Sequence, residues 1–164
     1  MLFRSELFVP TTMQAVAYMD QDVAVSPAGS RPRRFLLAPR LFAKLGQALE
    51  IGERDTVLEI GAATGYGAAV LARIARNVVA LESDETLAKQ ARDTLTAHKA
   101  ENVKVVTGSL ANGHAAEGPY DGILVNGAFP EIPATLLDQL KDGGRLVAVI
   151  VDRKSTRLNS SHIP

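Results

Sequence analysis

Two glutamates and two glycines near the middle of the chain have the types and spacing to bind a ligand that carries a ribose. Glu59 stands two positions before Gly61, Gly65 opens a run of helix-forming residues, and Glu82 closes the next apolar run. Glycines relieve the steric limit on the backbone angle φ, so the chain can turn tightly and pass close to a ligand. Amides at the start of a helix offer donors to an anionic group. A carboxylate that closes the second strand can accept hydrogen bonds from two ribose hydroxyls.

The glycines do not form the fingerprint of a dinucleotide-binding protein. That fingerprint is G-x-G-x-x-G, whereas positions 61, 63 and 66 read Gly, Ala and Tyr, and positions 65, 67 and 70 read Gly, Gly and Val. The glutamate in the first strand and the smaller glycine turn favour a ligand that carries an amino acid in place of the pyrophosphate. S-adenosylmethionine is such a ligand. A plain strand-to-helix turn is the alternative, and a nicotinamide enzyme is a more distant one.

Strands and helices alternate along the chain around these residues. Short apolar runs predict strands at 56–60, 77–81, 103–107, 122–125 and 145–151, and helical signals predict helices at 41–49, 68–75, 84–98 and 133–140. Nearly continuous valine, isoleucine and leucine in the strands indicates a mostly parallel sheet that helices cover on both faces. The predicted fold class is therefore α/β, doubly wound, with a ligand at the carboxyl ends of the strands.

Three segments are expected along the chain. Residues 1–50 form a loop-rich lead-in with a helix and one possible further short helix at 12–19, residues 51–151 form the ligand-binding domain, and residues 152–164 form a polar tail. The tail sequence RKSTRLNSSH, and the opening MLFRS, resemble non-native translated sequence that flanks truncated reading frames. We expect a non-native, solvated tail, with a natural tail as the alternative. The edge of strand 145–151 is then expected to be exposed.

Composition excludes several other classes of protein. The chain has 164 residues, with 18 Lys and Arg side chains, 18 Asp and Glu side chains and no cysteine. One domain is expected, with no net charge to attract nucleic acid and no run approaching the roughly 18 apolar residues of a membrane helix. We expect neither nucleic acid nor membrane as a partner, and cytoplasm as the default location. His98 and His114 have no partners at ligand spacing, so no metal is expected.

Several segments, taken in order, resemble the successive motifs of class I methyltransferases. They are VLEIGAATGY from residue 57, VVALESD from residue 78, PYDGILVNGAFPEIP from residue 119 and LKDGGRLVAVIV from residue 140. Two earlier segments, FVP at 8–10 and AYMDQD at 17–22, narrow the resemblance to the protein-L-isoaspartate O-methyltransferase family. The resemblance runs from Phe8 to Val151 and implies a Rossmann-like fold that lacks its last strands. It also implies S-adenosyl-L-methionine as cofactor, and damaged proteins or peptides that carry isoaspartate as substrate.

The same resemblance implies which residues form the site. The cofactor-binding residues would be Glu59, Gly61, Ala62, Gly65 and Tyr66 at the methionine end, Glu82 at the ribose, Ser109 and Leu110 at the adenine, and Asn126 beside the methyl group. Beside the matched active-site loop stand three arginines that could hold the substrate carboxylate, with a solvated loop as the alternative. They are Arg33, Arg34 and Arg40.

Two departures from the family pattern bear on function. Leu37 stands where the family's T-I-S-x-P loop has its serine, and Ser109 replaces an acid that often follows the third strand. We expect weaker positioning of the substrate and a reduced affinity for the cofactor. The expected function is O-methylation of isoaspartyl carboxylates in protein repair. The substrate's own carboxylate is ionised at neutral pH and is the nucleophile, so no general base is needed. A methyltransferase for another acceptor and a non-catalytic cofactor-binding fragment are the alternatives.

Overall fold

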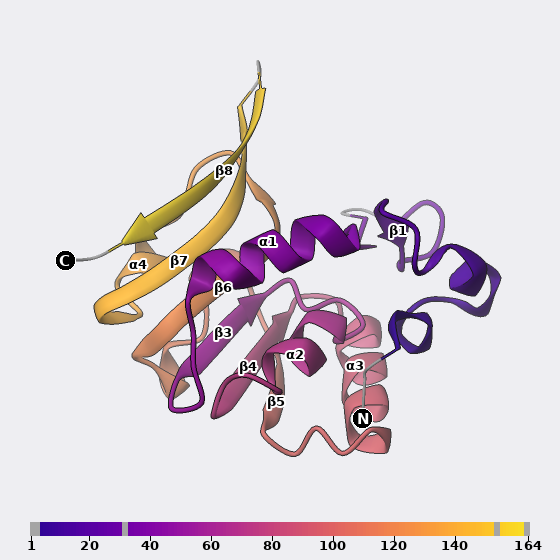
Figure 1. The fold of residues 1–164 in the computed structure, drawn as a ribbon, viewed down its shortest axis with the longest axis horizontal. Coiled ribbons are helices and arrows are strands. Elements are labelled where there is room, and N and C mark those ends of the chain that lie inside the picture. The colour runs from indigo at the N-terminus through magenta and orange to yellow at the C-terminus, as the bar shows by residue number, and fades with distance from the viewer. Residues whose placement is uncertain (1–3, 31–32, 153–154, 163–164) are drawn as a thin grey trace.

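The computed structural model describes residues 4–30, 33–152 and 155–162. In this part of the chain the centre is a six-stranded sheet with the order β5-β4-β3-β6-β7-β8 (Figure 1). The strands are β3 (Thr56–Ile60), β4 (Asn77–Glu82), β5 (Val103–Thr107), β6 (Tyr120–Phe129), β7 (Leu140–Asp152) and β8 (Ser155–His162). Strands β3 to β7 are parallel, and β8 runs antiparallel to β7. Because β3 lies between β4 and β6, the winding reverses between β3 and β6.

The helices follow local signals in the sequence. They are α1 (Pro39–Leu49), α2 (Tyr66–Leu71), α3 (Glu85–Ala97) and α4 (Ala134–Leu137), with short 3-10 helices η1 (Ser5–Phe8), η2 (Thr11–Val16), η3 (Leu110–Asn112) and η4 (Ala115–Glu117). Pro39 occupies the first turn of α1, where its missing N–H leaves no helical bond unmade. The Asp84 carboxylate accepts hydrogen bonds from the amides of Thr86 and Leu87, and so caps α3.

Some helix bounds differ from the sequence prediction. The segment predicted as helix 68–75 leaves the α-helix after Leu71. The side-chain amide of Asn102 donates to the carbonyls of Ala72, Ala75 and Arg76 beyond the helix end. The helix predicted at 133–140 is shorter because Leu140 already pairs in β7. The segment predicted at 12–19 forms the 3-10 helix η2.

Strand β6 carries a bulge where it leaves β3. Its register with β7 is Leu124 opposite Val147 and then Ala128 opposite Val149. Three residues of β6 therefore face one residue of β7, which is a local insertion that bends a strand and redirects its side chains. Asn126 is the middle residue of this bulge.

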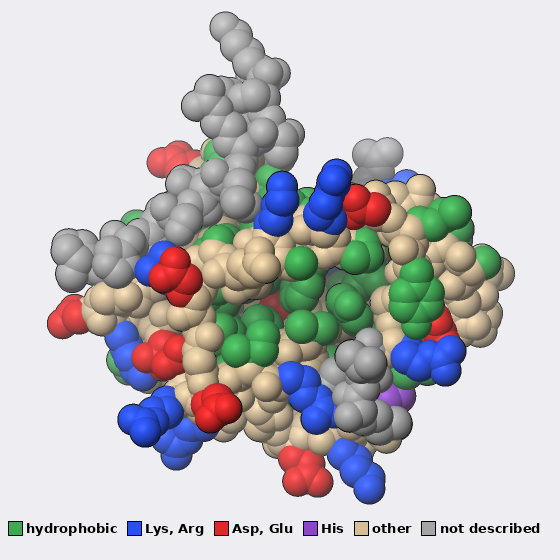
Figure 2. Space-filling view, in the orientation of Figure 1, with side chains coloured by type: hydrophobic (Ala, Val, Ile, Leu, Met, Phe, Trp, Pro, Cys, Tyr) green, Lys and Arg blue, Asp and Glu red, His purple; other side chains and the backbone are tan. Residues whose placement is uncertain are grey.

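The strands bury side chains on both of their faces. On one face Val57, Val78 and Leu124 pack in a core with residues of α1, α2 and α3. On the other face the neighbouring residues Leu58 and Ile123 pack in a second core with α4. Figure 2 shows the face that carries α1, α2 and α3, where hydrophobic side chains gather at the centre and charged side chains surround them. The predicted α/β, doubly wound fold class is confirmed.

The lead-in covers one end of the sheet. It contains a small antiparallel pair, β1 (Val23–Ala24) and β2 (Phe35–Leu36), which the sequence did not indicate. Its apolar side chains form a third core that includes Ala63, which belongs to the loop after β3. The Thr64 hydroxyl also donates to the carbonyl of Phe8 at 2.6 Å. The lead-in is therefore fixed above the carboxyl end of β3.

The edge of β7 is covered, contrary to the expectation of an exposed edge. Residues 155–162 of the tail, expected to be solvated, form β8 and pair with β7 from Arg145 opposite His162 to Asp152 opposite Ser155. Strand pairing uses backbone amides and carbonyls, so a segment without apolar periodicity can still form an edge strand. Residues 153–154 and 163–164 of the tail, and 1–3 of the opening, lie outside the described residues.

Within the described ranges, no helix is long and apolar enough to cross a membrane. The same ranges contain no group of three or more His, Asp or Glu side chains placed to hold a metal ion.

Candidate cofactor and substrate site

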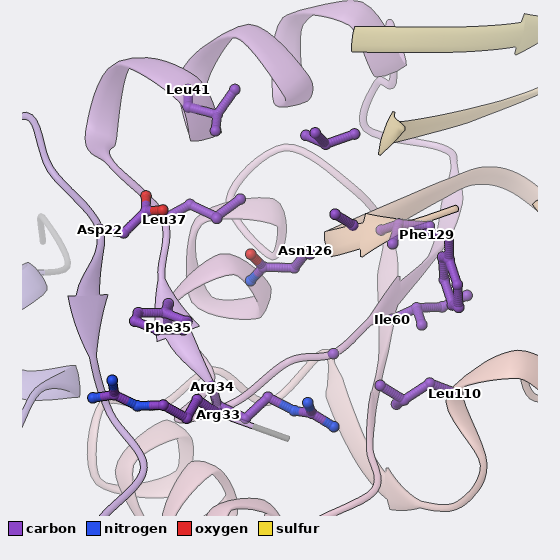
Figure 3. A pocket seen from close by; sticks show the side chains of 15 residues that line it. Asp22, Arg33, Arg34, Phe35, Leu37, Leu41, Ile60, Leu110, Asn126 and Phe129 are labelled. Carbon is purple, nitrogen blue, oxygen red and sulfur yellow. The ribbon is translucent and has the colours of Figure 1, made fainter. Parts of the chain in front are cut away.

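A cavity of about 460 Å³ lies at the carboxyl ends of β3 and β6. This is the place where the winding of the sheet reverses, which is where open α/β sheets bind ligands. The lead-in contributes the opposite wall of the cavity, with Arg33, Phe35 and Leu37 among its residues (Figure 3). The lining residues are Asp22, Arg33, Arg34, Phe35, Leu37, Leu41, Ile60, Gly61, Leu110, Val125, Asn126, Gly127, Ala128, Phe129 and Val149.

The turn after β3 brings the backbone close to this cavity. The amides of Gly61 and Ala62 both donate to the carbonyl of Leu81, so the turn is tied to the end of β4. Gly61 has φ +81°, and a Cβ on it would lie 3.0 Å from the carbonyl oxygen of Asn126. A side chain at position 61 would meet both a strained backbone and a fixed carbonyl. Glycine is therefore required for β3 and β6 to approach this closely.

Glu59 is fully buried beneath the cavity instead of lining it. One of its oxygens, Oε1, accepts a hydrogen bond from the Asn126 side-chain amide at 2.9 Å. Burial raises the pKa of Glu59 from 4.5 to about 8, although the bonds from Asn126 and from the Ala68 amide act in the opposite direction. At neutral pH the side chain is therefore mainly protonated. Glu59 influences the cavity through Asn126, which lines it.

The buried proton on Glu59 predicts a pH-dependent stability. The folded protein holds this proton more tightly than the unfolded chain, so the free energy of unfolding should fall as the pH rises from 4.5 through about 8. The contribution is about 1.4 kcal/mol per pH unit between the two pKa values. Denaturant unfolding of the parent and of Glu59→Gln at several pH values measures it. Glu59→Gln, which keeps the acceptor for Asn126, should flatten this part of the profile, and exposed Glu101→Gln should not. Equal slopes in parent and Glu59→Gln would contradict the assignment.

Glu82 lies at the end of β4 and is fully buried. Its carboxylate accepts hydrogen bonds from the backbone amides of Ala63 at 2.8 Å, Ser83 at 2.7 Å and Asp84 at 3.0 Å. The Arg34 guanidinium reaches it from the lead-in, with Nε 3.1 Å from Oε1 and 3.3 Å from Oε2. The acid predicted to bind ribose is thus paired with one of the arginines predicted to bind substrate.

The structure brings together only some of the predicted site residues. Gly61, Leu110 and Asn126 line the cavity with Arg33, Arg34 and Leu37. Ala62 and Gly65 are buried in the turn beside it. Tyr66 packs its ring against Phe8 and Phe42 at centroid distances of 5.6 and 5.8 Å. Ser109 precedes η3 without lining the cavity.

The three arginines have different partners. Arg40 pairs with Asp20 at 3.1 Å, and its side chain is 79% exposed outside the cavity. Arg33 lies over the ring of Phe35, with its guanidinium carbon 5.3 Å from the centroid. Arg34 is bound to Glu82. Arg33 is therefore the better placed of the two cavity arginines to meet an anionic substrate group.

Sequence reasoning missed the apolar wall of the cavity. Phe35, Leu41 and Phe129 line it, and Asp22 adds a carboxylate whose Oδ1 accepts from the Ala38 amide at 2.8 Å. Phe129 follows the predicted strand 122–125 by four residues, so a search of the residues after each strand could have found it. No sequence pattern around Asp22 or Phe35 marks them as site residues, because they reach the cavity only when the lead-in folds over the end of the sheet.

The residues present fit S-adenosylmethionine as a ligand. The cavity falls within the usual 300–1,000 Å³ of small-molecule sites. The Oδ1 atom of Asn126 is buried and has no hydrogen-bond partner among the described residues, and Figure 3 shows this side chain directed into the cavity. A buried acceptor without a partner is costly unless a ligand satisfies it, and the ammonium of an amino acid is a suitable donor. Glu82 has the chemistry to accept from ribose hydroxyls.

The parallel sheet, the glycine turn after β3 and the cavity at the reversal of winding define a Rossmann-like class I methyltransferase fold. A solved protein-L-isoaspartate O-methyltransferase matches with a TM-score of 0.83 at 29% identity, over 97% of this chain and 51% of that one. A Plasmodium falciparum structure, named as a beta-aspartate methyltransferase in complex with S-adenosyl-L-homocysteine, has a TM-score of 0.69 at 21% identity, over 96% of this chain and 76% of that one. At 21% identity, the match to the Plasmodium falciparum structure shows only that the two chains share a fold.

The family follows from the sequence comparisons. The profile described as Protein-L-isoaspartate(D-aspartate) O-methyltransferase matches residues 3–162. The protein-L-isoaspartate O-methyltransferase of Methanoculleus marisnigri is 40% identical over 148 residues, and that of Methanoregula boonei is 43% identical over 147 residues. Each alignment covers 90% of this chain and 65% of the relative. The chain belongs to the protein-L-isoaspartate(D-aspartate) O-methyltransferase family, and spans less than two thirds of the length of these two relatives.

Proposed function

We propose that this chain is an S-adenosylmethionine-dependent methyltransferase that acts on the carboxylates of isoaspartyl residues in damaged proteins. The observation that carries the proposal is the cavity at the reversal of winding, with the Gly61 turn and Asn126 in its wall and Glu82 beside it. Family membership supports the reaction, because the relatives are named for it. The partners are then damaged proteins or peptides.

The residues have separate tasks in this proposal. Asn126 Oδ1 and the Gly61 turn would hold the methionine end, Glu82 the ribose, and Leu110 the adenine side. When bound, the cofactor supplies a methyl group on a positively charged sulfur. The substrate carboxylate is ionised at neutral pH, so the chain needs to align it and to exclude water, without removing a proton. The apolar side chains of Leu37, Leu41 and Phe129 exclude water from the cavity.

A transfer assay tests the proposed reaction. The chain is incubated with S-adenosylmethionine that carries a labelled methyl group, and with a peptide that contains isoaspartate. The expected product is a base-labile methyl ester, which releases labelled methanol. The matched peptide with normal aspartate is the control and should remain unlabelled. Binding of S-adenosylhomocysteine without transfer to either peptide would reject the substrate while keeping the cofactor.

Leu37 gives a prediction about the rate of this transfer. It lines the cavity where the family's loop has a serine, so the substrate carboxylate lacks one hydroxyl donor. We expect slow methylation by the parent, and a rise of about tenfold or less in Leu37→Ser, because attack disperses the carboxylate's charge. Initial rates at saturating cofactor measure this. Leu41→Ser, which adds a hydroxyl elsewhere in the wall, is the matched control and should not raise the rate. A fast parent would show that Leu37 does not limit positioning.

A methyltransferase for a different acceptor is the second candidate. The observation in its favour is the apolar wall formed by Phe35, Leu37, Leu41 and Phe129, since a carboxylate is costly to desolvate among such side chains. An uncharged acceptor would fit this wall better. If the isoaspartyl peptide stays unlabelled in both the parent and Leu37→Ser, while S-adenosylhomocysteine binds, this candidate replaces the first.

A further inference from the structure

Arg34 occupies the acid that the proposed cofactor needs. Its Nε lies 3.1 Å from Oε1 and 3.3 Å from Oε2 of Glu82, and its Nη2 donates to the Ser83 hydroxyl at 2.7 Å. The side chain of Arg34 is 14% exposed and that of Glu82 is fully buried. The contact joins the lead-in to the end of β4, across 48 positions of sequence. It is therefore a feature of the folded site and not of a local turn.

With Arg34 in place, the Glu82 carboxylate has no capacity left for a ribose. An ionised carboxylate offers about four acceptor positions. The Ser83 and Asp84 amides use Oε1, the Ala63 amide uses Oε2, and Arg34 Nε lies within hydrogen-bond distance of both oxygens. The Ser83 hydroxyl also donates to Oε1, at 3.3 Å. The three amides belong to the turns that shape the site and are fixed. The guanidinium and the Ser83 hydroxyl belong to side chains and can leave without unfolding a turn, and of these two only the guanidinium is charged.

The lead-in holds Arg34 in this position through its backbone. The Arg34 amide donates to the Ser26 hydroxyl at 2.9 Å, and its carbonyl accepts from the Val25 amide at 3.0 Å. Both partners are buried residues of the lead-in next to β1. The side chain is thus presented to Glu82 from a fixed backbone, and only its own rotation is needed to release the carboxylate.

We propose that Arg34 competes with the ribose of S-adenosylmethionine for Glu82, so that Arg34 sets the affinity for the cofactor. This inference rests on the proposed function, because it assumes that the cofactor places its ribose at Glu82. A ligand with ribose hydroxyls must displace the guanidinium and break a charge-assisted hydrogen bond in a largely buried place. A ligand without these hydroxyls gains nothing from the displacement. Arg34 therefore penalises cofactor binding, and its removal should strengthen that binding.

Calorimetry with S-adenosylhomocysteine tests the competition. Arg34→Gln and Arg34→Met should each bind this probe about tenfold or more tightly than the parent, as expected when one charged hydrogen bond no longer has to be broken. Arg92→Gln removes one exposed positive charge from α3 and should bind like the parent. Circular dichroism shows whether each variant is folded. Two substitutions at position 34 are used so that a folding defect in one leaves the other to decide.

A second pair of probes isolates the ribose. Adenosine and 2′,3′-dideoxyadenosine differ only in the two hydroxyls, so Arg34→Met should gain affinity for the first and not for the second. Equal affinity of parent and variants for S-adenosylhomocysteine would overturn the competition and leave the proposed function standing. Weaker binding in both variants would also overturn it, because Arg34 would then support the cofactor. If no variant binds the probe although Glu82 is free, both the competition and the proposed cofactor site are rejected.

Discussion

Replacing Glu82 with alanine should lower the free energy of unfolding by about 3–5 kcal/mol and also weaken binding of S-adenosylhomocysteine at least tenfold. The loss of stability follows from the contacts of the buried carboxylate, because the amides of Ala63, Ser83 and Asp84 would lose their acceptor and Arg34 would lose its counter-charge. The loss of binding follows from the unpaired ribose hydroxyls. Denaturant unfolding and calorimetry measure the two effects separately.

Glu101→Ala is a matched control for this prediction, because Glu101 is exposed in the turn before β5. It should change neither quantity by more than about 0.5 kcal/mol. If Glu82→Ala were as stable as the parent, the amide contacts of the carboxylate would be worth little. If it bound the probe as tightly as the parent, Glu82 would not be the ribose acceptor, and the assigned cofactor site would be wrong.

Gly67→Ala should destabilise the protein by about 2–3 kcal/mol, although alanine is the better helix former. A Cβ at this position of α2 would lie 1.9 Å from Oε1 of Glu59 and 3.0 Å from Cε2 of Phe42. The Glu59 carboxyl is buried and bound to Asn126, so moving it breaks that hydrogen bond inside the core. Urea unfolding of the variant measures the cost.

Gly46→Ala is the matched control for Gly67→Ala. Gly46 also lies in a helix, α1, but a Cβ there would meet nothing within 4 Å. It should stabilise the protein by about 0.5–1 kcal/mol through helix propensity alone. If Gly46→Ala raises the free energy of unfolding and Gly67→Ala lowers it, then the space available for a Cβ, and not helix propensity, determines the effect at Gly67. A stabilising Gly67→Ala would mean that the Glu59 side chain moves aside at little cost.

The central strands were predictable because each packs on both faces. β3 has the predicted bounds, since Val57 and Leu58 enter the two opposite core layers and leave an apolar run that only Glu59 interrupts. The edge strand β5 also has the predicted bounds, although Lys104 within it is exposed. β6 and β7 extend beyond their apolar runs. Gly143 and Gly144 read as a turn but lie within β7, at an irregularity where the register with β6 passes from Leu140 opposite Tyr120 directly to Arg145 opposite Gly122. Backbone pairing leaves no trace in side-chain periodicity, and β8 is a further example.

The sequence predicted individual site residues, but it did not predict which of them contact one another. Local patterns identified Gly61 and Glu82, and the resemblance to the family identified Asn126. The partners of the charged groups had no local signal, since Arg34 reaches Glu82 only after the lead-in folds over the end of the sheet. The burial of Glu59 was equally hidden, because a glutamate within an apolar strand reads the same whether it faces solvent or the core.

The bulge in β6 separates the part of the chain that builds the sheet from the part that shapes the cavity. Leu124 and Ala128 remain paired with β7 on either side of it, while Asn126 and Gly127 line the cavity between them. A Cβ on Gly127 would meet nothing within 4 Å. The bulge is thus a short segment whose residues set part of the volume and polarity of the cavity, while the strand ladder continues on either side of it. Under the proposed function, a substitution at Gly127 would therefore alter what the cavity accepts without replacing a core residue.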